Sequence, residues 1–310
     1  MAIDILYYNK GEDPKQWLSA LRTALPQANI RHWTQGDNAR ADYALVWQPP
    51  EALLKGRKGL KAVFNLAAGV DALLASGWVP EDVPIFRLED AGMAIQMAEY
   101  TVYAVLKYFR RFDEYEHLQH QQKWTFLSSR CRQNFTVGIM GMGIMGNAAA
   151  DMLKPFGFPI KGWSRTAKQI EGVKTYYGHD GLSEFLKDVN VLVCLLPKTN
   201  ETVNLLDAKL FCQLPDGACL INLGRGALLN ENDLLKALKE GKIHAASLDV
   251  TAVEPLPLNH PFWNHPNITI TPHIAGLTTC EETVKIVADA IRLFENGGMP
   301  AGRVNRMRGY

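Results

Sequence analysis

The chain has 310 residues, of which 47% are hydrophobic and 21% charged, and its formal net charge is +1. This length suffices for two domains, and the balanced charge gives no global field that would attract nucleic acid or an anionic membrane. The first residues lack the basic and apolar regions of a signal peptide, and no apolar run approaches the roughly 20 residues that span a bilayer. The five cysteines include no C-x-x-C pair. We therefore expect a cytoplasmic protein with no nucleic-acid or membrane partner.

The first part of the chain alternates short apolar runs with helical patterns. A helix is expected over residues 14–25, and strands over residues 3–8, 29–33, 41–47, 60–66 and 84–88. One long amphipathic helix over residues 98–120 follows. The chain continues as a polar arm over residues 119–133, whose aromatic side chains Trp124 and Phe126 indicate a subunit contact.

Residues 135–166 form the most informative stretch. A short apolar run leads directly into a G-x-G-x-x-G sequence and then into a good helix opening and a second apolar run. By itself this pattern could be a glycine-rich turn. Its strand–turn–helix setting favours a dinucleotide site in which the pyrophosphate approaches the backbone and the helix N-terminus. The candidate cofactor residues of this turn are Gly141, Met142, Gly143, Ile144, Met145 and Gly146.

A second array of alternating elements follows. Strands are expected over residues 189–196, 217–223, 245–250 and 268–273, and helices over residues 182–187, 232–240 and 281–295. Two successive arrays predict an α/β protein with two Rossmann-like doubly wound parallel-sheet domains and an active-site cleft between them. The expected substrate-binding, flavodoxin-like domain comprises residues 1–97 plus 277–310, and the dinucleotide-binding Rossmann domain comprises residues 98–276.

Three side chains that could take part in catalysis follow predicted strands. Arg225 lies between two glycines, Glu254 precedes a proline, and His273 follows one. Singly they could be a turn residue, a solvated acid and a buried histidine. Jointly, an arginine that holds a carboxylate and a histidine tuned by a glutamate suit carbonyl reduction beside a nicotinamide. No histidine has metal-ligand spacing to a partner, so we expect no metal site.

These residues lie in motifs that resemble the D-isomer-specific 2-hydroxyacid dehydrogenases. The motifs are Leu223-Gly224-Arg225-Gly226, Leu248-Asp249-Val250 with Glu254-Pro255-Leu256-Pro257, Thr271-Pro272-His273-Ile274-Ala275-Gly276, and Cys194-Leu195-Leu196-Pro197 with Thr199 and Glu201-Thr202. With the glycine motif they span essentially the whole chain. Asp42–Trp47, Phe86–Asp90, Arg110–Asp113 and Arg308–Tyr310 further resemble the glyoxylate/hydroxypyruvate reductase A branch of that family.

The resemblance implies roles at the matching positions. Arg225 would bind the substrate carboxylate and carbonyl, His273 would protonate the carbonyl oxygen, and Glu254 would pair with His273. The backbone amides of Ala68, Gly69 and Val70 would hold the carboxylate. Trp47 would lie near the substrate, although it could equally be an aromatic residue that ends a core strand. Further cofactor contacts are implied for Leu196, Pro197, Thr202, Leu223, Gly224, Asp249 (near the nicotinamide amide), His273 and Gly276.

The end of the second strand of the nucleotide unit departs from the pattern of NAD sites. An acidic residue there would bind the ribose 2′-hydroxyl. This chain instead has Trp163, Ser164, Arg165 and Thr166, with Lys168 beyond and no acid before Glu171. A hydroxyl and a guanidinium suit a 2′-phosphate, which predicts NADP(H), with NAD(H) as the weaker alternative. The other interpretation is that Arg165 stacks on adenine without discriminating.

We therefore expect NADPH-dependent reduction of glyoxylate or hydroxypyruvate to glycolate or D-glycerate. One alternative is a non-catalytic nucleotide-sensing protein of the same fold, like some transcriptional co-repressors. Another is a related dehydrogenase acting on formate, phosphoglycerate, D-lactate or phenylpyruvate.

The sequence of Gly92–Glu99 also departs from the pattern of many relatives. Two methionines, Met93 and Met97, make an adaptable apolar wall there. The resemblance further implies a homodimer through the nucleotide-binding domain.

Overall fold

The computed structural model describes residues 3–310 and divides them into two compact units. One unit runs to Gly92 and is completed by Thr278–Tyr310, and the other comprises Met93–Leu277. The predicted boundary near residue 97 would fall inside helix α4 (Met93–Phe109). The structure keeps that helix whole within the second unit, because its buried face packs into that unit's core.

The first unit is built on a five-stranded parallel sheet with strand order β2-β1-β3-β4-β5. Its central strand β3 is almost fully buried, as expected for a parallel strand covered on both faces. Helix α10 returns from the end of the chain, and Glu295 on it accepts hydrogen bonds from Tyr43 and, at 2.6 Å, from Lys61 Nζ. The elements are β1 (Asp4–Asn9), α1 (Pro14–Ala24), β2 (Asn29–His32), β3 (Tyr43–Trp47), α2 (Glu51–Leu54), β4 (Ala62–Asn65), α3 (Asp71–Ser76), β5 (Ile85–Arg87) and α10 (Cys280–Glu295).

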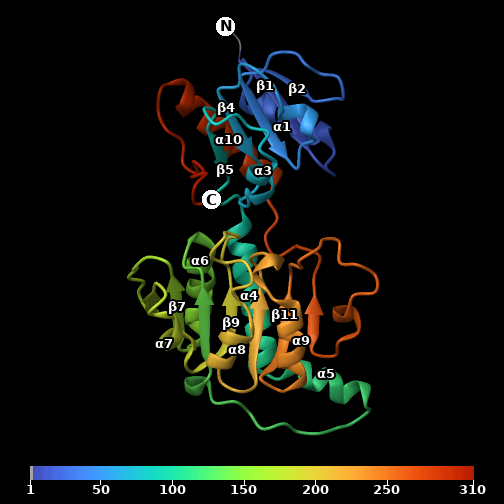
Figure 1. Cartoon of the computed structure of the whole chain (residues 1–310), viewed down its shortest axis with the longest axis vertical. Helices are drawn as coiled ribbons and strands as arrows, with labels where there is room; N and C mark the ends of the chain where they lie inside the picture. Colours follow the sequence, from blue (N-terminus) through green and yellow to red (C-terminus); the bar gives the residue numbers. More distant parts are fainter. Residues whose placement is uncertain (1–2) are drawn as a thin grey trace. The chain divides into compact units, whose positions relative to one another are not determined.

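The second unit is built on a seven-stranded parallel sheet with strand order β12-β11-β10-β9-β6-β7-β8 (Figure 1). Its elements are α4 (Met93–Phe109), α5 (Phe112–His120), η1 (Arg132–Asn134), β6 (Thr136–Met140), α6 (Ile144–Leu153), η2 (Lys154–Phe156), β7 (Ile160–Ser164), β8 (Lys174–Tyr177), α7 (Leu182–Leu186), β9 (Val189–Cys194), α8 (Ala208–Gln213), β10 (Ala218–Asn222), η3 (Gly226–Leu228), α9 (Glu231–Lys239), β11 (Ile243–Leu248), η4 (Pro261–Asn264) and β12 (Ile268–Ile270).

Helices cover both faces of this larger sheet. Helices α4 and α6 pack on one face around Val105, Ala150 and Val193, whereas α7, α8 and α9 pack on the other around Phe185, Phe211 and Leu234. The chain leaves β6 for β7 and β8 and then crosses back to β9 on the other side. The loops after β6 and β9 therefore lie at a topological switch point, where open α/β sheets bind ligands. The predicted fold class of two parallel-sheet α/β domains is confirmed.

The structure departs from the expected elements in two places of this unit that have a clear physical reason. The helix expected over residues 98–120 is interrupted, because Arg111 adopts a left-handed backbone conformation (φ 60°) between α4 and α5. The charged periodicity continues across this break, so the pattern did not reveal it. Strand β8 was not predicted, since its Lys-Thr-Tyr-Tyr sequence is half-exposed at the sheet edge and lacks an apolar run.

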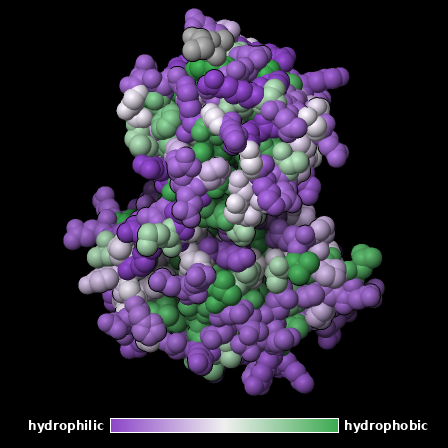
Figure 2. Space-filling model, turned by 45° about the horizontal axis from the view of Figure 1, so that its top comes forward, coloured by the Kyte–Doolittle hydropathy of each residue, from purple (hydrophilic) through white to green (hydrophobic). Residues whose placement is uncertain are grey.

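The surface is predominantly hydrophilic on the face drawn in Figure 2, with hydrophobic side chains gathered in small groups. Among residues 3–310, no helix combines the length and the apolar character that crossing a membrane requires.

Candidate active site

The loops after β6 and β9 are joined directly by the backbone. The amide of Leu195 donates to the carbonyl of Met140 over 2.8 Å. Gly141 then turns with φ +104°, and a Cβ at this position would lie 2.8 Å from the carbonyl oxygen of Leu195. Glycine is therefore required here both by the backbone conformation and by the neighbouring loop.

Packing within the chain requires glycine at one of the other two motif positions but not at the other. A Cβ at Gly146 would lie 2.0 Å from the carbonyl oxygen of Gly141, so α6 can approach β6 only without a side chain there. Gly143 has an ordinary φ of −85°, and its Cβ would meet no described atom within 4 Å. The packing of the chain itself does not require glycine at position 143. The open space at the N-terminus of a ten-residue helix fits a dinucleotide pyrophosphate.

The turn after β7 carries positively charged side chains, one of which contacts the glycine loop that follows β6. Lys168 Nζ donates to the carbonyl of Met142, while Arg165 and Thr166 are exposed. The hydroxyl of Ser164 is buried and donates to the carbonyl of Thr166 over 2.8 Å. Ser164 thus shapes the turn, and the positive charges of Arg165 and Lys168 are the features of this turn that suit an anionic group.

Arg225 is held by residues on either side of it. The buried side chain of Asn222, the last residue of β10, accepts from the Gly224 amide (3.2 Å) and donates to the Arg225 carbonyl (3.1 Å). Behind the arginine, a Cβ at Gly226 would lie 1.9 Å from the carbonyl carbon of Thr251. The loop that carries Arg225 is therefore packed directly on the loop that carries Glu254.

Glu254 and His273 form a hydrogen-bonded pair. His273 Nδ1 lies 2.8 Å from Glu254 Oε2, and Glu254 Oε1 accepts from the amide of Thr251 over 3.1 Å. Burial by itself would raise the pKa of Glu254, but the hydrogen bond and charge of His273, the Thr251 amide and the charge of Arg225 together hold that pKa below its ordinary value. The carboxylate fixes the proton of Nδ1, which leaves Nε2 as the nitrogen that can deliver a proton.

His273 lies beyond the end of β12 and not within a strand. Its φ is +57°, a left-handed conformation that costs a residue with a Cβ roughly 1–2 kcal/mol. The Asp249 carboxylate stabilises this turn: it accepts from Thr271 Oγ1 (2.6 Å), the Ile274 amide (2.9 Å) and the Ala275 amide (2.8 Å). Asp249 is only 2% exposed. The contacts of its carboxylate in the structure stabilise the segment that carries His273, residues 271–277.

In the first unit, a buried asparagine organises the loop that was predicted to hold a carboxylate. Asn65, the last residue of β4, donates to the carbonyls of Ala67 (2.8 Å) and Gly69 (2.9 Å). Trp47 is the last residue of β3 and is half-buried. Asn65 and Asn222 were both missed from the sequence. Their shared signal is a polar residue that ends an otherwise apolar strand.

Comparisons with known proteins agree with this geometry. A family model described as "D-isomer specific 2-hydroxyacid dehydrogenase, NAD binding domain" matches residues 102–275. The chain belongs to the D-isomer specific 2-hydroxyacid dehydrogenase family. A glyoxylate/hydroxypyruvate reductase A from Serratia proteamaculans is 49% identical over 99% of this chain and 100% of that protein, and one from Yersinia enterocolitica is 48% identical over the same shares.

Two solved structures of family members extend the likeness to the fold. A D-isomer specific 2-hydroxyacid dehydrogenase from Xanthobacter autotrophicus, in complex with NADPH and MES, has a TM-score of 0.95 and 36% identity over 100% of both chains. An NADPH-dependent glyoxylate/hydroxypyruvate reductase from Sinorhizobium meliloti, in complex with NADP and sulfate, has a TM-score of 0.93 and 35% identity over 99% of this chain and 100% of that one. The predicted family is thus confirmed.

The remaining cofactor candidates of this dehydrogenase family member line the same ends of its strands. Leu196 is buried behind Gly224, whose Cβ would lie 2.6 Å from the Leu196 carbonyl oxygen. Thr202 Oγ1 donates to the Pro197 carbonyl over 2.7 Å and so closes the loop after β9. Leu223 and Gly276 follow β10 and β12. These positions remain predictions for cofactor contacts.

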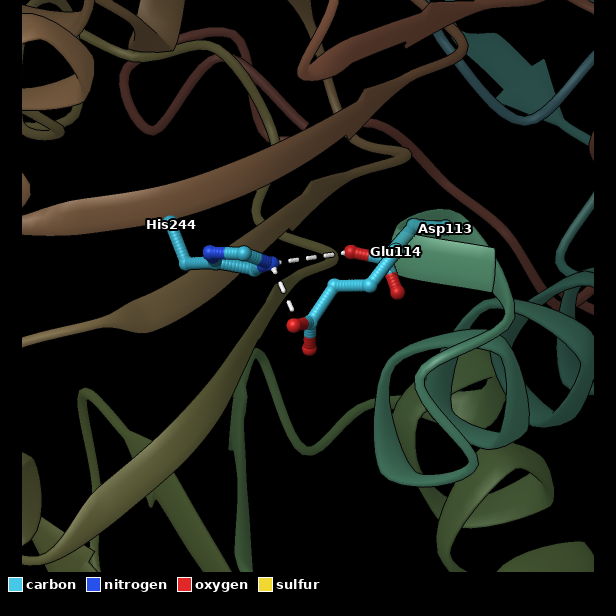
Figure 3. Close-up of side chains that lie close together, drawn as sticks. All are labelled: Asp113, Glu114 and His244. Carbon is cyan, nitrogen blue, oxygen red and sulfur yellow. Dashed lines mark hydrogen bonds and ion pairs between the residues drawn. The ribbon is translucent and has the colours of Figure 1, made fainter. Parts of the chain in front are cut away.

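A separate cluster of possible metal ligands lies where α5 meets β11 in the nucleotide unit. Figure 3 shows His244 facing Asp113 and Glu114, with Nε2 3.0 Å from Asp113 Oδ2 and 4.0 Å from Glu114 Oε1. Glu114 also receives two hydrogen bonds from Arg111 and one from Arg130. The hydrogen bond from Arg111 holds the pKa of Glu114 below its ordinary value despite burial, with further help from the charges of Arg111, His244 and Arg130. We interpret this cluster as an ion-pair network that fastens α5 to β11.

Proposed function

We propose that the chain reduces the carbonyl group of a small 2-oxo acid, glyoxylate or hydroxypyruvate, to the corresponding 2-hydroxy acid with NADPH. The products are glycolate and D-glycerate. The observation that carries this proposal is the Glu254–His273 pair, which lies next to the loop of Arg225 at the C-terminal edge of a dinucleotide-binding sheet. Full-length relatives named glyoxylate/hydroxypyruvate reductase A support the substrate class.

The proposed roles follow from the chemistry of the side chains. NADPH supplies a hydride to the carbonyl carbon when it is bound. Arg225 binds the substrate carboxylate through its planar fork and stabilises the negative charge that develops on the carbonyl oxygen. His273 donates the Nε2 proton to that oxygen, and Glu254 stabilises the imidazolium before transfer. We propose that the amides of Ala68, Gly69 and Val70 bind the substrate carboxylate and that Trp47 contacts the substrate.

A kinetic panel tests the reaction. Glyoxylate, hydroxypyruvate, pyruvate and phenylpyruvate are assayed with NADPH and with NADH, and kcat/KM is compared. Highest kcat/KM for glyoxylate or hydroxypyruvate with NADPH supports the proposal. An absence of turnover with every 2-oxo acid, although NADPH binds, would favour a nucleotide-sensing role instead.

Cofactor choice is assigned to the turn after β7. We expect Arg165→Ala to lower kcat/KM for NADPH by about 10- to 100-fold, the effect of losing a hydrogen bond to a charged group, and to change kcat/KM for NADH little. Lys174→Ala is the matched control, because this exposed lysine pairs with Lys161 at the opposite, N-terminal ends of β7 and β8. A wild-type preference for NADH would refute the assignment.

We propose that two copies associate through the nucleotide-binding unit. After α5 the chain runs as an extended stretch (Figure 1), in which Trp124 is 97% and Phe126 91% exposed. The stretch is anchored, since Arg111 donates to the Ser128 carbonyl and Arg130 to the Tyr108 carbonyl. An anchored segment that presents two exposed aromatic side chains is suited to a second copy of the chain.

Sedimentation velocity tests this association. Wild type is expected to sediment as a dimer, and the double variant Trp124→Ser, Phe126→Ser as a monomer at the same concentration. Met307→Ser is the control, because Met307 is 99% exposed but belongs to the other unit. A double variant that stays dimeric would place the contact elsewhere.

We also propose that the protein acts in the cytoplasm. All five of its cysteines are free thiols, which suits a reducing compartment.

A further inference from the structure

The segment that carries His273 rests on the first turns of α4. The side chain of Gln96 pairs with the backbone of Leu277 in both directions, donating through Nε2 over 2.8 Å and accepting through Oε1 over 3.3 Å. Gly276 lies against Met97, since a Cβ on this glycine would lie 2.9 Å from Met97 Cγ. The helix therefore supports the far end of the segment through contacts that leave His273 itself untouched.

One turn along the helix, Tyr100 reaches the near end of the same segment. Its hydroxyl lies 2.8 Å from Thr271 Oγ1, which in turn donates to Asp249 Oδ1 over 2.6 Å. An ionised carboxylate only accepts, so the single hydroxyl proton of Thr271 is committed to Asp249. Tyr100 must then be the donor to Thr271. The hydrogen bonds run in one direction, from Tyr100 to Thr271 to Asp249.

This chain of hydrogen bonds ends at His273 and at the two residues that follow it. Asp249 receives the amides of Ile274 and Ala275 through its carboxylate, and its backbone carbonyl accepts the amide of His273 over 2.8 Å. His273 has an unfavourable left-handed backbone, so its conformation depends on these surrounding bonds. A change at Tyr100 therefore reaches the imidazole through Thr271 and Asp249.

We propose that Tyr100 is a positioning residue for the proton-transfer step. Its hydroxyl fixes Thr271 and Asp249, and thereby sets the direction of the His273 ring relative to Glu254 and the substrate carbonyl. This inference rests on the proposed function, because His273 is its proton donor. Tyr100 does not itself exchange a proton with the substrate.

Kinetics of Tyr100→Phe test the inference. We expect kcat for glyoxylate to fall about three- to tenfold, which corresponds to one lost hydrogen bond, with KM for glyoxylate and NADPH within about twofold of wild type. The matched control is Tyr108→Phe. Tyr108 lies on the same helix and pairs its buried hydroxyl with Ser247 Oγ at 2.7 Å, away from the histidine segment. Its kcat is expected to stay within about twofold.

Thr271 supplies a second variant on the same path. Thr271→Val should lower kcat at least as much as Tyr100→Phe, and Thr271→Ser should retain the wild-type rate because it keeps the hydroxyl. The double variant Tyr100→Phe, Thr271→Val should be no slower than Thr271→Val alone, since both changes interrupt one chain of bonds. Additive losses would overturn the inference.

A spectroscopic readout separates this inference from the proposed function. In 15N-histidine-labelled protein, the His273 imidazole resonances are assigned with His273→Ala and compared among the variants. Tyr100→Phe should displace these resonances, and Tyr108→Phe should leave them unchanged. Unchanged His273 resonances in Tyr100→Phe would overturn the inference. Failure of the proposed function would appear separately, as absence of turnover by the wild type.

Discussion

His273→Ala is expected to lower kcat for glyoxylate reduction by about 10²–10⁴-fold, the range typical of a lost general acid. The ring is held by Glu254 at Nδ1, over 2.8 Å, so Nε2 is the only nitrogen of this histidine available to protonate the carbonyl oxygen. The dissociation constant of NADPH, measured by fluorescence titration, should change little. Binding would then be retained while the chemical step is lost.

His260→Ala provides the matched control for this experiment. His260 also pairs a ring nitrogen with a glutamate, since its Nε2 lies 3.2 Å from Glu231 Oε2, but it has no proposed part in the reaction. Its kcat should remain close to wild type. Added imidazole should restore part of the rate of His273→Ala by replacing the missing proton donor. If His273→Ala turned over at the wild-type rate, the proton would have to come from another group.

The ionisation of Glu254 determines how stability and kcat change at acidic pH. Its folded-state pKa is lowered, so the stability that this carboxylate contributes through His273 is present above its unfolded pKa. That stability is lost only as the pH falls through the still lower folded value. The pair therefore persists throughout the neutral range. Glu254→Gln removes the carboxylate that titrates at low pH, so the acid limb of kcat against pH should disappear.

The sequence predicted the features that depend on local pattern. Buried parallel strands produce unbroken apolar runs, and the spacing of Gly141, Gly143 and Gly146 indicated a nucleotide turn in which the packing of the chain explains Gly141 and Gly146. The strand ends then placed Arg225, Glu254 and His273 at one edge of one sheet. Parallel strands necessarily bring their C-terminal ends together, so sequence order sufficed to predict this neighbourhood.

Features that depend on individual hydrogen bonds, whether local or between distant residues, were not predictable. The hydroxyl of Ser164 was expected to face the cofactor, but only the structure shows that it donates to the Thr166 carbonyl. The link from Tyr100 to Thr271 joins residues 171 positions apart, and no periodicity encodes it. The left-handed turn at His273 is likewise determined by the carboxylate of Asp249 and not by its own sequence, which shows only a histidine after a proline.

Arg225→Ala is the second change expected to have a large effect. We expect KM for glyoxylate to rise and kcat to fall, with kcat/KM reduced by about 10²–10⁴-fold, because a charge-assisted bidentate pair and a stabilising charge in the transition state are both lost. The backbone should not collapse, because Asn222 holds the Arg225 carbonyl and the Gly224 amide independently of the guanidinium. Steady-state kinetics measure KM for glyoxylate and kcat. The NADPH dissociation constant shows whether cofactor binding is retained.

Arg225→Lys separates charge from geometry in this prediction. Lysine keeps the positive charge but loses the planar fork, so it should recover only a small part of kcat/KM. Added guanidinium ion should restore part of the activity of Arg225→Ala and none of that of His273→Ala, whose missing group is a proton donor. The charge of Arg225 also helps to lower the pKa of Glu254. The acid limb of the Arg225→Ala profile should therefore move to higher pH, and an unchanged KM with an unchanged profile would remove Arg225 from the site.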